Sequence, residues 1–229
     1  MSFSIIIPVY NESENILKLS QEINSALKNF HDYEVIFIDD GSIDNTINIL
    51  DDIKRKYSFE FIKNKKNIGQ SFSILAGIKN SIYDTIVTLD GDGQNNPEDI
   101  PKLLEIYFNQ DKYYLVGGLR LKRKDNFIKR ISSKIANKVR QSILKDNCSD
   151  TGCSLKVFSK KIFLQFPEFK SMHRFLPALF KGYGYGTYFI EVEHRNREKG
   201  KSKYGTLDRL FRGIFDLINV KLMINKINK

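Results

Sequence analysis

The sequence of 229 residues has no tryptophan, two cysteines and three histidines. No set of cysteines and histidines is present that could complete a zinc site, so we expect Cys148 and Cys153 to be buried, reduced thiols. The N-terminus, MSFSIIIPVYNE, lacks the basic segment of a signal peptide, and its apolar stretch is too short to span a membrane. We therefore expect a cytosolic chain.

Three loops that would identify common ligand sites are also missing. The turn PVYNES after the first apolar run has no glycine, which argues against a dinucleotide-binding G-x-G-x-x-G loop. No G-x-x-x-x-G-K-[ST] loop occurs, so the usual nucleotide triphosphatase is excluded. DGDGQNNPEDIP departs from a calcium-binding EF-hand loop, because Asn95 replaces the required glycine and Pro101 the final glutamate.

Positive charge is abundant, with 37 Lys and Arg against 27 Asp and Glu. Residues 120–145 are strongly basic, with Asp125 as their one acidic residue, and a second basic cluster runs from Arg195 to Arg212. Such an excess indicates an anionic partner, which could be nucleic acid, a membrane or a phosphorylated substrate.

Apolar runs alternate with helical periodicity along most of the chain. FSIIIPVY precedes Ile16, Leu19, Ile23 and Leu27 at helical spacing, and the same unit recurs with YEVIFIDDGS, FEFIKN and DTIVTLDGD. Runs this uniformly apolar predict an α/β fold with a mostly parallel, Rossmann-like sheet that helices cover on both faces.

We expect residues 1–205 to form one catalytic domain and 206–229 an amphipathic C-terminal helix. Either a membrane-interfacial or a core-facing position would suit this helix. The apolar stripe consists of Leu207, Leu210, Phe211, Ile214, Ile218 and Leu222.

Polar residues follow several of the predicted strands, where open parallel sheets bind ligands. Asp90, Asp92 and Gln94 would offer oxygen ligands to Mg²⁺ or Mn²⁺ held mainly by the phosphates of a ligand, with Gly91 letting the backbone approach that ligand, although a simple turn before a helix fits too. Asp39 or Asp40 could accept hydrogen bonds from a base or cap a turn.

The segment HRNREKGKSKYG and the residue His173 have two interpretations each. HRNREKGKSKYG is either a loop that closes over phosphates or a solvated loop. His173 is more typical of a packed helix histidine than of a catalytic base, and Asp150 is a second candidate base.

The motifs IIPVYNE, IDDGS, LDGDGQNNPEDIPKLL, SDTGCSLKVF, HRFLPAL and HRNREKGKSKYG occur in this order over nearly the whole chain. Together they resemble family 2 glycosyltransferases of the dolichol-phosphate mannosyltransferase-like group. The resemblance implies a GT-A fold, a GDP- or UDP-sugar donor, Mg²⁺ or Mn²⁺, and a polyprenyl phosphate acceptor at the cytosolic membrane face.

The resemblance also assigns residues to roles. It implies catalytic roles for Asp90, Asp92 and Arg120, and metal binding by Asp92 and Gln94. The implied nucleotide-sugar contacts are Pro8, Tyr10, Glu12, Ile38, Asp40, Asp90, Gly91 and Asp92. The implied acceptor-phosphate contacts are Arg120, Lys129, Arg130, Ser133, Arg197 and Lys203.

We therefore expect inverting sugar transfer at the membrane surface, with or without a small membrane partner protein and without nucleic acid. Many relatives continue into transmembrane helices, so attachment is expected to come from the surface or from a partner. One alternative is transfer to a sugar hydroxyl, which would need a base such as Asp150 or His173. Another is a non-catalytic basic binder of nucleic acid or anionic membrane.

Overall fold

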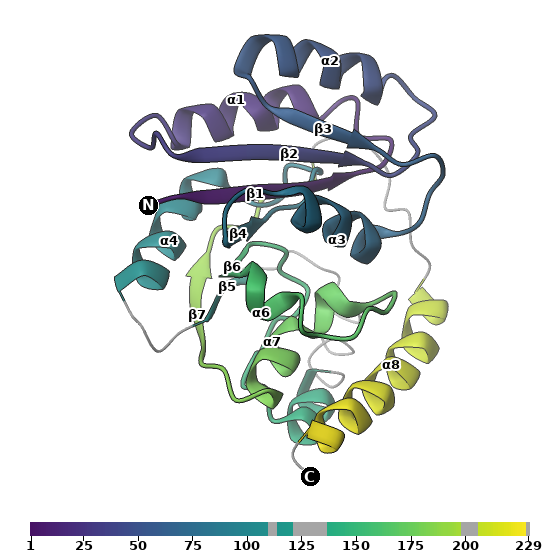
Figure 1. Cartoon of the computed structure of the whole chain (residues 1–229). Helices are drawn as coiled ribbons and strands as arrows, with labels where there is room; N and C mark the ends of the chain where they lie inside the picture. The colour runs from purple at the N-terminus through teal and green to yellow at the C-terminus, as the bar shows by residue number, and fades with distance from the viewer. Residues whose placement is uncertain (110–113, 121–136, 198–205, 228–229) are drawn as a thin grey trace.

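The apolar runs form one mixed sheet in a computed structural model that describes residues 1–109, 114–120, 137–197 and 206–227 (Figure 1). The strands are β1 (Phe3–Val9), β2 (Tyr33–Asp39), β3 (Glu60–Lys63), β4 (Thr85–Thr88), β5 (Leu115–Arg120), β6 (Lys156–Ser159) and β7 (Thr187–Val192). The helices are α1 (Ile16–Ala26), α2 (Thr46–Tyr57), α3 (Gln70–Asn80), η1 (Pro97–Asp99), α4 (Ile100–Asn109), α6 (Lys160–Phe163), α7 (Met172–Gly182) and α8 (Thr206–Ile227), with a further helix over residues 137–144.

The strand order among the described residues is β3-β2-β1-β4-β6-β5-β7. β1 pairs in parallel with β2 and β4, and β5 pairs in parallel with β7, whereas β6 is antiparallel to β4 and β5. The predicted α/β fold with a mostly parallel sheet is confirmed. Because only β6 is reversed, the ends of β1, β2, β4, β5 and β7 and the beginning of β6 lie along one edge.

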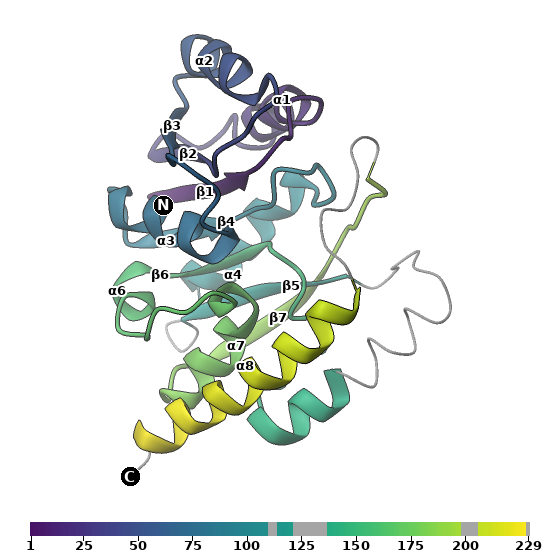
Figure 2. The same cartoon turned by 90° about the vertical axis from the view of Figure 1, so that its right-hand side faces the viewer.

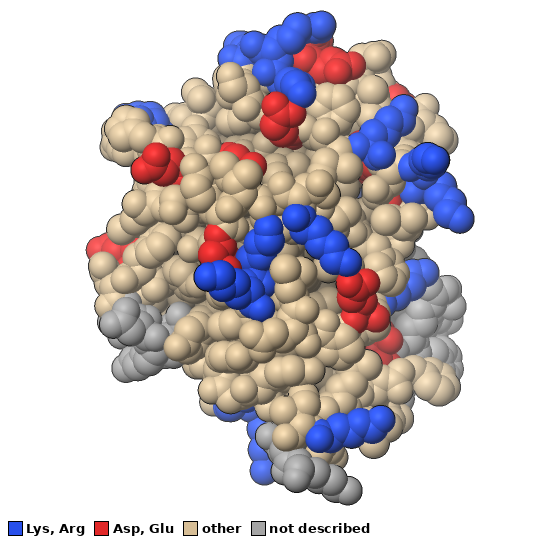
Figure 3. All heavy atoms as spheres, in the orientation of Figure 1, with Lys and Arg blue, Asp and Glu red and all other residues tan. Residues whose placement is uncertain are grey.

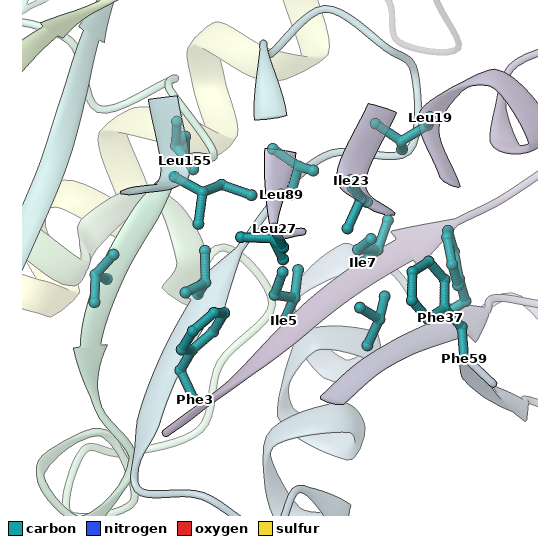
Figure 4. Packing of buried hydrophobic residues seen from close by; sticks show 14 of the residues in the cluster. Phe3, Ile5, Ile7, Leu19, Ile23, Leu27, Phe37, Phe59, Leu89 and Leu155 are labelled. Carbon is teal, nitrogen blue, oxygen red and sulfur yellow. The ribbon is translucent and has the colours of Figure 1, made fainter. Parts of the chain in front are cut away.

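Side chains of β1 alternate between two cores. Phe3, Ile5 and Ile7 pack with α1, α2 and α4 on one face (Figure 4), whereas Ile6 packs with α3, α7 and α8 on the other. Full burial of a large apolar side chain stabilises a fold by about 1.5–3 kcal/mol. Both faces are therefore covered, which explains why the strands carry uninterrupted apolar runs.

α8 has one buried and one exposed apolar face. Leu217, Val220 and Ile224 are buried. The helix packs against α7, where a side chain at Gly182 would meet Ile224 at 2.6 Å. The exposed apolar face consists of Phe215, Ile218 and Leu222, with exposed fractions of 70%, 53% and 55%.

One face of α8 is therefore core-facing, whereas the membrane-interfacial position stays a prediction for its exposed face. Ile218 and Leu222 lie on its exposed face. The other four stripe residues have side chains outside the described ones, namely Leu207, Leu210, Phe211 and Ile214. The division at residue 205 stays a prediction.

Cys148 and Cys153 are buried and free, as predicted. Arg140, from the basic stretch, is also buried and pairs with Asp146 at 2.9 Å, so its charge belongs to the interior and not to a basic surface. Among the described residues, we find no helix of the length and apolarity needed to cross a membrane.

Candidate active site

The loop after β4 brings two carboxylates to the polar edge of the sheet. Gly91 separates Asp90 from Asp92 and is buried against β1, where an added Cβ would lie 2.4 Å from Val9 Cγ1. Close packing therefore requires glycine here, and the expected approach of a ligand to the Gly91 backbone stays a prediction. The Asp92 carboxylate accepts a hydrogen bond from the backbone of Gln94 at 3.1 Å, which stabilises the turn.

Asp90 lies at the centre of the site. Its carboxylate accepts a hydrogen bond from Gln70 at 2.7 Å, and its charge interacts with those of Asp92, Arg120 and Lys156. Burial and the neighbouring Asp92 charge raise the pKa of Asp90 to about 6. The Asp92 side chain is partly exposed and contacts the Arg197 guanidinium, so it is the candidate for binding a cation.

Arg120, at the end of β5, forms a bidentate ion pair with Asp150. Nε and Nη2 of Arg120 donate to the two Asp150 carboxylate oxygens at 2.6 and 2.7 Å. The backbone of Gly152 also donates to Asp150, at 3.2 Å. The two side chains are 13% and 9% exposed, so Asp150 fixes the planar guanidinium at the edge of the site.

Glu12 follows β1 and is buried beneath the site. Asn15 donates to one of its carboxylate oxygens at 2.7 Å, and Arg197 Nη2 donates to the other at 2.8 Å. The same Nη2 atom lies 3.4 Å from Asp92 Oδ2. One guanidinium nitrogen thus bridges carboxylates that follow β1 and β4.

Asp40, after β2, has a well-defined structural role. Its carboxylate accepts backbone hydrogen bonds from Ile68 and Gly69, both at 2.9 Å, and a side-chain hydrogen bond from Asn64 at 3.1 Å. These contacts hold the segment that leads into α3 at the edge of the site. The predicted contact of Asp40 with a base stays a prediction.

Ile38, near the end of β2, has its side chain in the apolar core. The side chain is 0% exposed, and an added Cβ at Gly77 would meet it at 2.6 Å. The apolar run that predicted β2 gave no indication of which face Ile38 would occupy. The predicted place of Ile38 beside a nucleotide stays a prediction.

The segment after β7 is joined to the β4 loop. The Arg195 backbone N–H donates to Gln94 O at 2.8 Å, and the Gln94 side-chain amide donates to Arg195 O at 3.3 Å. Asn96 donates to Glu193 at 2.6 Å. Gln94 therefore also positions the segment that carries Arg197, while its predicted contact with a metal stays untested.

The remaining predicted residues differ in position. Pro8 and Tyr10 are partly exposed at the end of β1. His173 Nδ1 shares a 2.6 Å hydrogen bond with Ser71 Oγ, which joins α7 to α3. Four predicted acceptor-phosphate residues lie outside the described ones, namely Lys129, Arg130, Ser133 and Lys203.

Sequence reasoning did not identify three residues of the site. Gln70 contacts Asp90. It belongs to the segment KNIGQ after β3, and segments that follow the strands of a parallel sheet are where ligand-binding residues are expected. Lys156 is a buried lysine that donates to the carbonyl of Cys153. In the sequence, its single charge within an apolar run was the sign of a special role. Glu22 pairs with Arg195 at 2.9 Å across 173 residues, which no sequence pattern indicates.

The site fits a divalent cation held mainly by its ligand. Asp92 and Glu12 already face a positively charged group, the Arg197 guanidinium. Within the described ranges, no cluster of three or more His, Cys, Asp or Glu side chains could hold a metal alone. Such a site suits Mg²⁺ or Mn²⁺, because these ions often take few protein ligands and complete their coordination with phosphates and water.

Comparison with known proteins agrees with this arrangement. Residues 4–166 match the family model for glycosyl transferase family 2. The chain is 34% identical over 218 residues to an undecaprenyl-phosphate 4-deoxy-4-formamido-L-arabinose transferase of Pseudomonas fluorescens, covering 94% of this chain and 63% of that one. It is 33% identical to a dodecaprenyl-phosphate galacturonate synthase of Rhizobium johnstonii, covering 96% and 66%. The chain thus spans less than two thirds of the length of these relatives.

Solved structures show the same fold at low sequence identity. Mannosyl-3-phosphoglycerate synthase of Rubrobacter xylanophilus aligns with a TM-score of 0.73 at 12% identity, covering 99% of this chain and 75% of that one. Glucosyl-3-phosphoglycerate synthase of Mycobacterium tuberculosis, crystallised with Mn²⁺ and UDP, gives 0.69 at 16%, covering 97% and 79%. The fold is GT-A, and the chain belongs to glycosyl transferase family 2.

Proposed function

We propose that this chain transfers a sugar from a GDP- or UDP-linked donor to a polyprenyl phosphate at the cytosolic face of a membrane, with inversion at the anomeric carbon. One observation carries the proposal. Acidic Asp90 and Asp92 and cationic Arg120 come from different strands to one edge of the sheet, close enough for their charges to interact. The relatives named for transfer to lipid phosphates supply the substrate class.

On the donor side, we assign Asp92 to a divalent cation that the donor's diphosphate helps to hold. A bound cation would stabilise the negative charge that develops on the departing nucleotide diphosphate. Gln70 keeps Asp90 in place beneath the loop through its 2.7 Å hydrogen bond. Glu12 and Asp40 are anchored at neighbouring strand ends, so they border the donor region.

On the acceptor side, a phosphate monoester is already an anionic nucleophile at neutral pH and requires no general base. Arg120 is the described cation best placed to orient it, because Asp150 fixes the guanidinium plane while one terminal nitrogen, Nη1, is outside that bidentate contact. A single displacement, in which the acceptor oxygen bonds to the anomeric carbon as the nucleotide diphosphate leaves, inverts that carbon.

The contacts of Asp150 favour this acceptor over a sugar hydroxyl. Both carboxylate oxygens of Asp150 accept hydrogen bonds from Arg120, so taking a proton from an acceptor would require this pair to break. Asp150 therefore does not stand ready as a base. His173 is joined through Nδ1 to Ser71, which links α7 to α3.

The exposed face of α8 supports membrane association. Its apolar side chains Phe215, Ile218 and Leu222 are at least half exposed among the described residues. α8 lies beside the helix of residues 137–144 (Figures 1 and 2). That helix adds exposed Val139 and Ile143.

The surroundings of this apolar surface suit an anionic lipid headgroup layer. Lys138 and Lys221 stand beside apolar residues of the two helices. In Figure 3 the surface over α7 and α8 is mostly uncharged, while basic side chains gather over α2 and α3. We assign this surface to peripheral contact with a lipid bilayer, since apolar side chains with nearby lysines suit that environment.

The test of the function is release of nucleotide diphosphate by the purified protein. UDP- and GDP-sugars are supplied with Mg²⁺ or Mn²⁺, with and without polyprenyl phosphate in detergent. We expect release from one donor only when the lipid phosphate is present. Lipid-independent transfer to soluble sugars would support a hydroxyl acceptor, and no release with any donor would support a binding protein.

A further inference from the structure

We infer that Arg197 is a built-in counter-ion that occupies the position of the divalent cation and competes with it. This inference rests on the proposed function, because it concerns the cation assigned to Asp92. Arg197 Nη2 lies 2.8 Å from Glu12 Oε1 and 3.4 Å from Asp92 Oδ2. A single charged nitrogen therefore contacts carboxylates that follow two neighbouring strands.

The position of Arg197 is fixed by backbone pairing of its own segment. Arg195 N–H donates to Gln94 O, and an isolated antiparallel bridge joins His194 to Asn95. Arg195 also holds Glu22 of α1 through contacts of 2.9 Å to both carboxylate oxygens. These contacts lie within three residues of Arg197 in sequence, so they aim its side chain at the carboxylates.

Electrostatics explains why Glu12 and Asp92 need a positively charged group beside them when no metal is bound. Glu12 is buried and Asp92 is only partly exposed, so two negative charges close together would repel each other in surroundings that screen poorly. Arg197 offsets this repulsion. A divalent cation would offset it more strongly, but it would be repelled by the guanidinium at the same place.

Exchange between the two cations gives Arg197 a role in each state. Before the donor binds, the guanidinium stabilises Glu12 and Asp92. When a divalent cation arrives with a nucleotide diphosphate, the guanidinium leaves the carboxylates and can bind a phosphate, since arginine binds either group through charged hydrogen bonds. Cation binding and phosphate binding by Arg197 are thereby coupled.

The test measures Mn²⁺ binding to the full chain without nucleotide, by electron paramagnetic resonance of the free ion. Arg197→Gln removes the charge but keeps a hydrogen-bonding side chain, and Arg197→Ala removes both. Because the guanidinium no longer competes for the carboxylates, we expect both variants to bind Mn²⁺ roughly tenfold more tightly than the wild type or better. Turnover should fall in the same variants.

Arg55→Gln is the matched control. It removes the same charge from an exposed position on α2, where the Arg55 guanidinium pairs with Asp52 and takes no part in positioning Arg197. A melting curve of each variant checks that it is folded. If Arg197→Ala is not folded, the Mn²⁺ binding of the more conservative Arg197→Gln decides the test.

Tighter Mn²⁺ binding in the Arg197 variants and not in Arg55→Gln would support the inference. Equal tightening in all three would overturn it, because the effect would then come from net charge alone. Unchanged, weaker or absent Mn²⁺ binding in the Arg197 variants would overturn it too. The proposed function is judged separately by lipid-dependent nucleotide release from the wild type.

Discussion

Arg120 and Asp150 form a two-point ion pair, with Nε to Oδ2 at 2.6 Å and Nη2 to Oδ1 at 2.7 Å. The pair joins the end of β5 to the loop that precedes β6, and both side chains are largely buried. Asp150 is therefore a positioning residue for Arg120 in the proposed mechanism. This relationship also separates the phosphate-acceptor reaction from one that uses Asp150 as a base.

Breaking this pair should affect both stability and catalysis. Arg120→Ala leaves the Asp150 carboxylate buried without its partner, which typically costs about 3–5 kcal/mol. We expect a lower Tm and an increased KM for the lipid phosphate. The double variant Arg120→Ala with Asp150→Ala should be less destabilised than the sum of the single variants, by about 1–3 kcal/mol in urea unfolding. Additive effects would show that the two residues do not act together.

Asp92→Asn should abolish turnover while leaving the fold intact. The substitution keeps the size of the side chain and its acceptor for the Gln94 backbone, but removes the charge that we assign to cation binding. We expect a loss of at least about 100-fold in kcat, in line with the loss of one electrostatic contact to a transition state, and a nearly unchanged Tm. Asp52→Asn, exposed on α2, is the control that should remain active. Full activity in Asp92→Asn would remove the metal assignment.

The raised pKa of Asp90 predicts a pH-dependent penalty on stability. Its value shifts from 3.8 to about 6, so the native protein retains a proton between these pH values that the unfolded chain has released. The free energy of unfolding contributed by Asp90 therefore falls as the pH rises through this window, by at most about 3 kcal/mol. Asp90→Asn should raise Tm at pH 7.5 in EDTA.

The gain from Asp90→Asn should shrink as the pH falls through this window and disappear below about pH 3, where Asp90 is protonated in both the folded and the unfolded wild type. Melting curves of both proteins from about pH 3 to 8 measure this difference. The isosteric asparagine can still accept the hydrogen bond from Gln70. A Tm difference that stays constant across this range would contradict the assigned pKa.

Replacing the exposed apolar face of α8 should weaken membrane binding without weakening the fold. Phe215, Ile218 and Leu222 are at least half exposed, so their change to serine or glutamine removes little packing. We expect co-sedimentation with vesicles that contain anionic lipid to fall roughly tenfold or more, since each buried CH₂ group contributes about 0.8 kcal/mol. Tm should stay within about 2 °C, as expected for surface substitutions.

Two single variants calibrate the α8 experiment. Ile82→Gln removes an apolar side chain that is 71% exposed in the connection between α3 and β4, and should leave vesicle binding unchanged. Ile224→Ala, on the buried face of α8, should instead lower stability by about 2–5 kcal/mol. Equal loss of vesicle binding in Ile82→Gln would show that the α8 face has no special part in it.

The sequence was sufficient for much of the fold. The apolar runs and helical spacings predicted β1, α1, β2, α2 and their alternation, because a sheet buried on both faces requires uninterrupted apolar strands. The reversal of β6 was not predicted. Orientation depends on pairing with β4 and β5, which are far away in the chain, and no local pattern reports such pairing.

The candidate site was predictable only where one local motif supplied it. Asp90 and Asp92 follow a strand directly, and they could be predicted because open parallel sheets bind ligands at the carboxyl ends of their strands. The partners that fix their surroundings come from distant segments, as with Arg197 and Glu12, which are 185 residues apart. The burial of the Ile38 side chain was not predicted either, because a fully apolar strand does not reveal which core each side chain enters.

The most direct test of the central claim is to identify the product. The purified protein is incubated with undecaprenyl phosphate, a divalent cation and the sugar-labelled donor, and the organic extract is analysed by mass spectrometry. We predict a lipid phosphate heavier by one sugar unit, absent when Asp92→Asn replaces the wild type. Label that remains in the aqueous phase, while the wild type releases nucleotide diphosphate, would contradict transfer to a polyprenyl phosphate.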